Sequence, residues 1–197
     1  MTYDLDSITS DCYEGTTCLV NKFDIMDEKI LSRIETDITF AKSAELEQNP
    51  IEGNFDTKHY KAIHKYLFED LYDWAGTFRT INMSKKGTSF IDHEKLDETC
   101  ERCFSRLRSN NYLKGLDYDS FVEEIVDLYC LLNIIHPFRE GNGRVERIFI
   151  TQLIRHNGYE LNFSEIDTDL LMIATIQAAH GVNNNLKMII KDSMKHQ

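Results

Sequence analysis

The sequence predicts one all-α domain, a bundle of helices around a buried central helix, with a short β-hairpin on its surface. Three observations lead to this fold class: apolar residues recur at helical spacing along most of the chain, one segment is apolar around most of its circumference, and a single stretch breaks the helical pattern. The 197 residues, 42% of them apolar, are enough for a hydrophobic core, and no run rich in Ser, Gly or Pro divides them. We therefore expect a single domain, 1–197, in which residues 1 to about 50 form an N-terminal extension packed on the core.

The helices are predicted from the spacing of apolar residues. The expected segments, in order, are 27–46, 58–71, 94–107, 120–135, 144–155, 168–179 and 186–194. Segment 120–135 carries apolar side chains on most of its faces, which is typical of a helix buried in the middle of a bundle. Gly158 and Gly181 stand just past two of these segments, where a left-handed residue commonly ends a helix.

Residues 79–91 break the helical pattern. β-prone residues flank a turn that contains Gly87, with Lys85 and Lys86 at its tip, so we expect a β-hairpin. An isolated two-stranded hairpin is only marginally stable in water. Its role must therefore come from the residues that it lies against.

The composition argues against several functions. A formal net charge of −11 leaves no cluster of Lys and Arg for direct binding to nucleic acid. No apolar stretch reaches the ~20 residues that cross a bilayer, so no membrane segment is expected. The five cysteines are an odd number without a disulfide framework, and we expect reduced thiols in the cytoplasm. Cys100 and Cys103 form a lone C-x-x-C pair, which we interpret as two helix residues instead of a zinc or redox centre.

Residues 136–147 concentrate the chemistry of the chain. Pro137 ends the central helix, because the residue before a proline avoids helical geometry, and this presents His136 at a helix end. The turn Gly141-Asn142-Gly143 then opens the next helix. A glycine-rich turn at a helix N-terminus binds anions through its backbone N–H groups. Phe138 has no evident catalytic use, and we expect it to anchor the loop in the core.

Charged side chains surround this turn. Arg144 and Arg147, three residues apart on the first helical turn, can both reach phosphate oxygens there. Glu140 stands just before the turn, and a carboxylate beside bound phosphates suits Mg²⁺. The ordinary histidine pKa of ~6.5 suits His136 to act as a general base. Each feature has an ordinary structural explanation by itself, but together they predict a site for nucleotidyl transfer.

The same segment resembles the signature of the Fic proteins, H-x-F-x-(D/E)-G-N-G-R-x-x-R, and every specified position of that motif is matched. The resemblance continues outside the motif. Residues 13–21 look like the opening of bacterial cell-filamentation Fic proteins, and residues 71–79 look like the approach to their flap. The resemblance covers nearly the whole chain, and it implies the Fic fold, in which the hairpin is a flap beside the active site.

The resemblance also implies a function: a protein adenylyltransferase that moves AMP from ATP onto a Ser, Thr or Tyr hydroxyl of a target protein and releases pyrophosphate. His136 would deprotonate the hydroxyl, and Glu140 would hold Mg²⁺ or Mn²⁺. The phosphates of the nucleotide would be bound by Gly141, Asn142, Gly143, Arg144 and Arg147. The flap would pair with the backbone of the target, through Asn82, Met83, Ser84, Thr88, Ser89 and Phe90.

Four alternatives to this function are weighed against the residues. The Doc branch of the same fold transfers a phosphoryl group, but its motif has lysine where this chain has Gly143. Other nucleotides, such as UTP or GTP, are not excluded by any residue. A non-catalytic Fic-fold interaction module would have no reason to keep both His136 and Glu140, and the net charge of −11 disfavours a DNA-binding regulator.

Control of such an enzyme is the last expectation. Many Fic proteins are inhibited by a glutamate, in the pattern (S/T)-x-x-x-E-(G/N), that pairs with the last arginine of the motif, here Arg147. The best-placed candidate is Glu35, but Leu31 and Thr36 depart from the pattern at both ends, and Glu14 matches it in a segment without helical periodicity. We therefore expect weak or absent self-inhibition, with control by an antitoxin-like inhibitor or by target supply. By analogy with bacterial Fic toxins, a type II topoisomerase subunit is an expected target.

Overall fold

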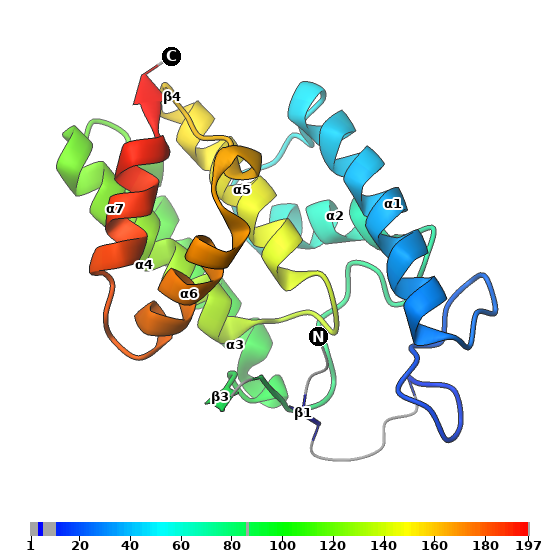
Figure 1. Cartoon of the computed structure of the whole chain (residues 1–197). Coiled ribbons are helices and arrows are strands. Elements are labelled where there is room, and N and C mark those ends of the chain that lie inside the picture. The colour runs from blue at the N-terminus through cyan, green and yellow to red at the C-terminus, as the bar shows by residue number, and fades with distance from the viewer. Residues whose placement is uncertain (1–3, 6–10, 86, 197) are drawn as a thin grey trace.

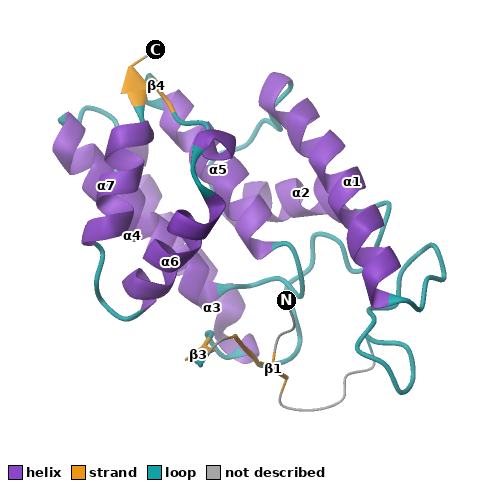
Figure 2. Cartoon of the chain, viewed as in Figure 1, coloured by secondary structure: helices purple, strands orange, loops and turns teal. Residues whose placement is uncertain are grey.

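The computed structural model describes residues 4–5, 11–85 and 87–196 of the chain. Most of this part is helical, and the strands are short and lie at two ends of the molecule (Figure 1 and Figure 2). The helices are α1 (Glu28–Gln48), α2 (Thr57–Phe68), α3 (Leu96–Ser109), α4 (Tyr118–Ile135), α5 (Asn142–His156), α6 (Thr168–Ala179) and α7 (Asn184–Ser193). The strands are β1 (Asp4–Leu5), β2 (Met83–Lys85), β3 (Thr88–Ser89), β4 (Tyr159–Glu160) and β5 (Lys195–His196). Short 3-10 helices lie at His93–Lys95, Asn111–Leu113 and Phe163–Glu165. The all-α fold class is confirmed.

Helix α4 is the centre of the bundle. It packs against α3, α5, α6 and α7 (Figure 1). Its buried side chains are Phe121, Val122, Ile125, Val126, Leu128, Tyr129, Leu132 and Ile135. The helix is not buried on every side, because Glu123 and Asp127 are exposed, and Glu123 forms an ion pair with Lys187 of α7. The predicted central helix is therefore confirmed, with one polar stripe along its solvent side.

Local sequence sets the ends of the helices. Asp27 precedes α1 and Asp117 precedes α4, and each carboxylate accepts hydrogen bonds from N–H groups of the first turn. Gly158 and Gly181 follow α5 and α6 with φ of 82° and 86°, so both predicted stop signals are confirmed. Helix α2 ends at Phe68, earlier than predicted, because the Phe68 carbonyl accepts two bonds from the turn that follows.

The predicted hairpin is present and belongs to a three-stranded sheet. Strands β2 and β3 pair antiparallel, with Ser84 opposite Ser89. Strand β1 pairs with the other edge of β2, with Leu5 opposite Met83. A strand of two residues carries no periodicity, so β1 is absent from the sequence prediction. Strands β4 and β5 pair with each other at the far end of the molecule.

The N-terminal part of the chain contacts the segment that carries the motif. Helix α1 packs against α2 and α5. Arg139, within the motif, is buried, and its Nε lies 2.5 Å from Oδ2 of Asp11. The motif loop is thus fixed by residues far from it in the sequence.

Two expectations from composition can be compared with the structure. No disulfide joins the five cysteines. Cys100 and Cys103 are buried on α3, and burial raises the pKa of each thiol to about 12, as for ordinary core residues. Across the described ranges, no helix combines the length and the apolar character that crossing a membrane requires.

Candidate active site

His136 ends α4 at its C-cap, in the left-handed conformation with φ 46° and ψ 58°. This is the helix end that Pro137 predicts. A non-glycine residue in this conformation needs support from its surroundings. Buried Arg79 supplies it: its Nε donates to the His136 carbonyl at 2.9 Å, and its backbone N–H donates to the Pro137 carbonyl at 2.9 Å. Arg79, which the sequence analysis missed as a functional residue, thereby ties the base of the flap to this loop.

The contacts of His136 fix which ring nitrogen carries hydrogen. Its Nδ1 lies 3.2 Å from the Asn133 carbonyl oxygen, which can only accept, so Nδ1 carries the hydrogen and the lone pair is on Nε2. Burial lowers the pKa of His136 to about 3, and the positive charges of Lys85 and Arg79 act in the same direction. At neutral pH the imidazole is therefore uncharged and able to accept a proton.

The turn before α5 is built on Gly141. This residue is the N-cap of α5 with φ 81°, and a Cβ placed on it would lie 2.1 Å from the ring of Phe68. Only glycine fits both the backbone conformation and the space. Because Gly141 has no side chain to cap the helix, first-turn N–H groups of α5 are left for an anion.

The side chain of Asn142 has a structural role beside the anion-binding role expected of its backbone. Its side chain is 2% exposed, accepts a bond from the Phe138 N–H at 2.8 Å and donates one to the Phe138 carbonyl at 2.7 Å. The side chain therefore holds the loop together. Only the backbone N–H of Asn142 is left to contact a phosphate. Phe138 itself is fully buried and stacks on His64 with 3.9 Å between ring centroids, which confirms it as the anchor of the loop.

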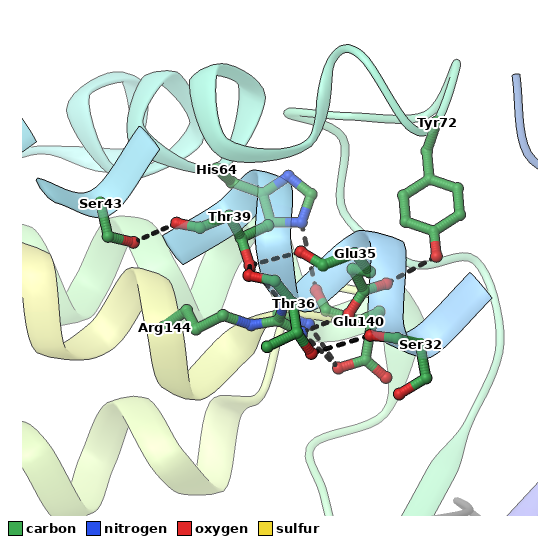
Figure 3. A network of polar contacts seen from close by, with 10 residues as sticks. Ser32, Glu35, Thr36, Thr39, Ser43, His64, Tyr72, Glu140 and Arg144 are labelled. Atoms are coloured by element: carbon green, nitrogen blue, oxygen red, sulfur yellow. Dashed lines mark hydrogen bonds and ion pairs between the residues drawn. The ribbon is translucent and has the colours of Figure 1, made fainter. Parts of the chain in front are cut away.

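Arg144 is held against α1. Figure 3 shows Glu35 reaching from α1 toward it, and their charged atoms, Oε1 and Nη2, lie 2.6 Å apart. Arg144 also donates to Oγ1 of Thr39 at 3.0 Å and approaches Oε1 of Glu140 at 3.3 Å. An inhibitory glutamate of the family pattern would pair with Arg147, whereas Glu35, the best-placed candidate, meets Arg144, because α1 crosses α5 at the first arginine of the motif.

Glu140 lies between this network and the turn. Its Oε1 accepts a bond from the Gly141 N–H at 2.8 Å, and its carbonyl lies 3.2 Å from Nε2 of His64. His64 accepts from the Gly76 N–H through Nδ1 at 2.8 Å, so Nε2 carries the hydrogen that Glu140 receives. His64, another residue missed in the sequence, thus orients the backbone of the predicted metal ligand.

A cavity of about 740 Å³ runs between α1 and α5. Glu140, Arg144 and Arg147 line it from the motif, and Lys85 lines it from the flap. Its volume falls within the ~300–1,000 Å³ typical of small-molecule sites. The charge of Lys85 also lowers the pKa of His136, so a residue of the cavity lining acts electrostatically on the histidine. The sequence places Lys85 only at the tip of the hairpin.

A metal ion fits one part of this site. The described residues contain no group of three or more His, Cys, Asp or Glu side chains that would hold a metal by themselves. Glu140 nevertheless supplies one carboxylate beside the anion turn, and Mg²⁺ typically takes one or two protein carboxylates and completes its shell with phosphate oxygens and water. The arrangement therefore fits a metal that binds together with a nucleotide.

The flap residues divide into three groups. The side chain of Asn82 accepts a bond from the His93 N–H at 3.0 Å, and Met83 is buried, so both serve the base of the flap. Ser84, Thr88 and Ser89 form the paired part of the hairpin. Beyond it, the ring of Phe90 stacks on His136.

The fold and the site define a class of protein: an all-α domain with a histidine at the end of its central helix, a glycine-rich turn that opens the next helix, and a cavity lined by two arginines of that helix. The model of the Fic/DOC family matches residues 54–154. The chain belongs to the Fic/DOC family, as the motif predicts.

Curated relatives extend this similarity. Protein adenylyltransferase VbhT from Bartonella schoenbuchensis is 32% identical over 91% of this chain, which spans 37% of the length of VbhT. The probable protein adenylyltransferase Fic of Escherichia coli is 30% identical over 90% of this chain and 88% of its own length.

Solved structures show the same fold. BepC from Bartonella tribocorum, with bound AMPPNP, has a TM-score of 0.88 and 29% identity over 95% of this chain and 97% of that chain. The N-terminal Fic domain of a Bartonella quintana protein, with bound ADP, has a TM-score of 0.89 and 27% identity over 95% of each chain. The expected Fic fold is confirmed.

Proposed function

We propose that this chain is a protein adenylyltransferase, which transfers AMP from ATP to a Ser, Thr or Tyr hydroxyl of a target protein and releases pyrophosphate. The observation that carries the proposal is the state of His136, uncharged with its lone pair on Nε2, together with a cavity lined by Glu140, Arg144 and Arg147 of the same motif. The names of the relatives and the nucleotides bound in similar Fic domains support it.

The reaction follows from this geometry. Nε2 of His136 accepts the proton of the target hydroxyl, whose oxygen attacks the α-phosphorus of ATP. The bond between the α-phosphorus and the bridging oxygen breaks, and pyrophosphate leaves with that electron pair. Arg144, Arg147 and the N–H groups of the turn stabilise the negative charge on the phosphates. Mg²⁺ held by Glu140, when bound, neutralises part of the same charge.

The low pKa of His136 is compatible with this role. The positive charges of Lys85 and Arg79 contribute to it, after burial. A bound triphosphate brings several negative charges close to Lys85, which offsets that repulsion. The histidine is thus kept uncharged in the resting enzyme, and its protonated form is stabilised when the substrate is present.

Transfer of AMP is favoured over transfer of a phosphoryl group by Gly143. A Cβ on this residue would lie 3.2 Å from Nη1 of Arg147, so glycine leaves room for that guanidinium at the anion turn. A longer side chain would change where the triphosphate sits. ATP is the default nucleotide of the proposal, and UTP or GTP would give the same chemistry.

The proposal includes partners. The flap holds the backbone of an extended target segment, so that main-chain bonds position the hydroxyl with little demand on sequence. A type II topoisomerase subunit is the target by family analogy, the reaction takes place in the cytoplasm, and an antitoxin-like protein restrains it.

The decisive experiment incubates purified protein with a bacterial lysate and ATP labelled at either the α or the γ position. We expect a protein to be labelled by α-labelled ATP and not by γ-labelled ATP. We also expect no labelling when EDTA is present during the reaction. Label from γ-labelled ATP would indicate phosphoryl transfer, and no label from either would favour the non-catalytic interaction module. UTP and GTP with α label, run in parallel, identify the preferred nucleotide.

A further inference from the structure

The side chain of Arg144 is held by Glu35 of α1, and Glu35 is in turn held by a second partner. Glu35 is 9% exposed, and its Oε1 lies 2.6 Å from Nη2 of Arg144. Its other oxygen, Oε2, accepts a hydrogen bond from the hydroxyl of Tyr72 at 2.6 Å. Figure 3 shows Glu35 between these two partners. Both oxygens of the carboxylate are therefore engaged, one by the arginine and one by the tyrosine.

Tyr72 anchors the carboxylate from within the core. The tyrosine is 1% exposed and stacks on Trp74 with 4.3 Å between ring centroids. Burial and the charge of Glu35 raise the pKa of Tyr72 far above its ordinary value, so the phenol keeps its hydrogen and donates it. Because one oxygen of the Glu35 carboxylate is held by this buried phenol, the rotation of the Glu35 side chain is restricted.

The remaining contacts hold the guanidinium in one plane. The hydroxyl of Thr39 donates to the Glu35 carbonyl at 2.7 Å, which leaves its oxygen to accept from Nη1 of Arg144 at 3.0 Å. The ring of Phe68 lies 4.9 Å from the guanidinium carbon of Arg144. A charged group held this way reaches a ligand without losing further side-chain freedom.

We infer that Glu35, oriented by Tyr72, is a positioning residue that holds Arg144 ready for the phosphates of the nucleotide, and not an inhibitory residue. Glu35, Arg144 and Glu140 line the same cavity, while Tyr72 lies behind Glu35 and outside the lining. This inference rests on the proposed function, because it assigns the phosphates of ATP to the cavity. A positioning role and an inhibitory role predict opposite effects of removing the Glu35 charge. If Glu35 positions Arg144, its loss weakens ATP binding, whereas loss of an inhibitory residue would raise the transfer rate.

The test compares nucleotide binding by calorimetry in the parent, Glu35→Gln, Tyr72→Phe and Glu47→Gln. Glu47 is the matched control, because it lies on the same helix, lines the same cavity and is exposed. Glutamine at position 35 keeps the size of the side chain and an oxygen for Tyr72 but loses the charge that holds Arg144. We expect the Kd for ATP to rise about tenfold in Glu35→Gln and about threefold in Tyr72→Phe. The Kd for AMP should change less than twofold in both variants. In Glu47→Gln, the Kd for ATP and the Kd for AMP should both change less than twofold.

A merely structural role would weaken ATP and AMP binding together, and that result would overturn the inference. An increase of tenfold or more in the initial transfer rate of Glu35→Gln, at saturating ATP, would show that Glu35 inhibits. If Glu35→Gln does not fold, as judged by thermal unfolding, Tyr72→Phe decides, and an unchanged Kd for ATP in that variant would contradict the inference. Failure of the parent to bind ATP would instead reject the proposed function.

Discussion

The ring of Phe90 lies parallel to the imidazole of His136, with 3.8 Å between their centroids and 5° between their planes. Phe90 belongs to the flap and His136 to the end of α4, so the flap covers the proposed general base directly. The stack excludes water from one face of the imidazole, and burial is the main cause of the low pKa of His136. The flap therefore contributes to the burial that keeps this base uncharged.

Removing this cover should change the titration of His136. In Phe90→Ala, partial loss of burial favours the charged imidazole, so the pKa of His136 should rise from about 3 toward the ordinary ~6.5. An NMR titration of the imidazole resonances measures the change. Phe23→Ala, at an exposed phenylalanine, is the control. An unchanged His136 titration in Phe90→Ala would show that the stack does not matter.

His136→Ala should keep the fold and lose transfer. The hydroxyl nucleophile then has no base, and a general base typically contributes about 10²–10⁴-fold in rate. We expect at least a hundredfold decrease in incorporation of label from α-labelled ATP, with an unaltered circular dichroism spectrum. His180→Ala, at an exposed histidine near the end of α6, should retain full activity. Parental activity in a folded His136→Ala protein would reject the mechanism.

Stability should fall in acid because two histidines are buried in the uncharged form. Burial lowers the pKa of both His64 and His136 to about 3, below the ~6.5 of the unfolded chain. Between these values the unfolded state binds more protons. Each histidine therefore contributes stability that is complete above pH ~6.5 and decreases by about 1.4 kcal/mol for each pH unit toward pH ~3.

Urea unfolding of the parent and His64→Gln between pH 4 and pH 7 measures this contribution. Glutamine can donate to the Glu140 carbonyl but does not titrate, so the slope of unfolding free energy against pH should decrease by about 1.4 kcal/mol per pH unit. His180→Gln should leave the slope as it is. Equal slopes for the parent and His64→Gln would mean that His64 is not buried uncharged.

Gly141 should tolerate alanine much less well than Gly87 does. Both have positive φ, 81° and 78°, which costs a non-glycine residue roughly 1–2 kcal/mol. Only Gly141 also places the new Cβ against the ring of Phe68, whereas at Gly87 no atom of the described residues beyond its chain neighbours lies within 4 Å of that position. Overpacking typically adds about 1–3 kcal/mol. Denaturant unfolding should show Gly141→Ala less stable than Gly87→Ala by that amount, and equal losses would mean that Phe68 moves aside freely.

Gly143→Lys should reduce AMP transfer. The first atom of the new side chain meets Nη1 of Arg147 at 3.2 Å, and the rest of it brings a second cation into the anion turn. The triphosphate should then sit differently, so less label is transferred from α-labelled ATP and transfer from γ-labelled ATP becomes possible. Gly143→Ala brings a Cβ close to Arg147 but adds no charge, so it separates the effect of crowding from the effect of the added cation. Parental AMP transfer by Gly143→Lys would contradict the role given to this glycine.

The sequence predicts the site best where local backbone rules and chemistry coincide. Pro137 and Gly141 dictate the end of one helix and the start of the next, so the positions of His136 and the anion turn follow from neighbouring residues. The residues that support them could not be found this way. Arg79 reaches His136 across 57 positions of the chain, and only the packed helices bring the two together.

The same reason explains why the sequence does not reveal the partner of Glu35. The spacing of apolar residues places Glu35 on an amphipathic helix, but the arginine that it meets depends on where α1 crosses α5. Arg144 and Arg147 are nearly one helical turn apart, and the sequence of α1 contains no information on that crossing point. Tyr72, which fixes the orientation of Glu35, lies in a turn with no periodic signal at all.

Strand β1 has a practical consequence for work on this enzyme. Asp4 and Leu5 pair with Ser84 and Met83, so a purification tag or fusion partner joined ahead of them would be delivered to the sheet that contains the flap. The C-terminal strand β5 lies at the opposite end of the molecule (Figure 1). Recombinant protein for transfer assays should therefore carry its tag after residue 197. A weak activity measured with an N-terminal fusion can be caused by the fusion partner at the sheet and not by the enzyme itself.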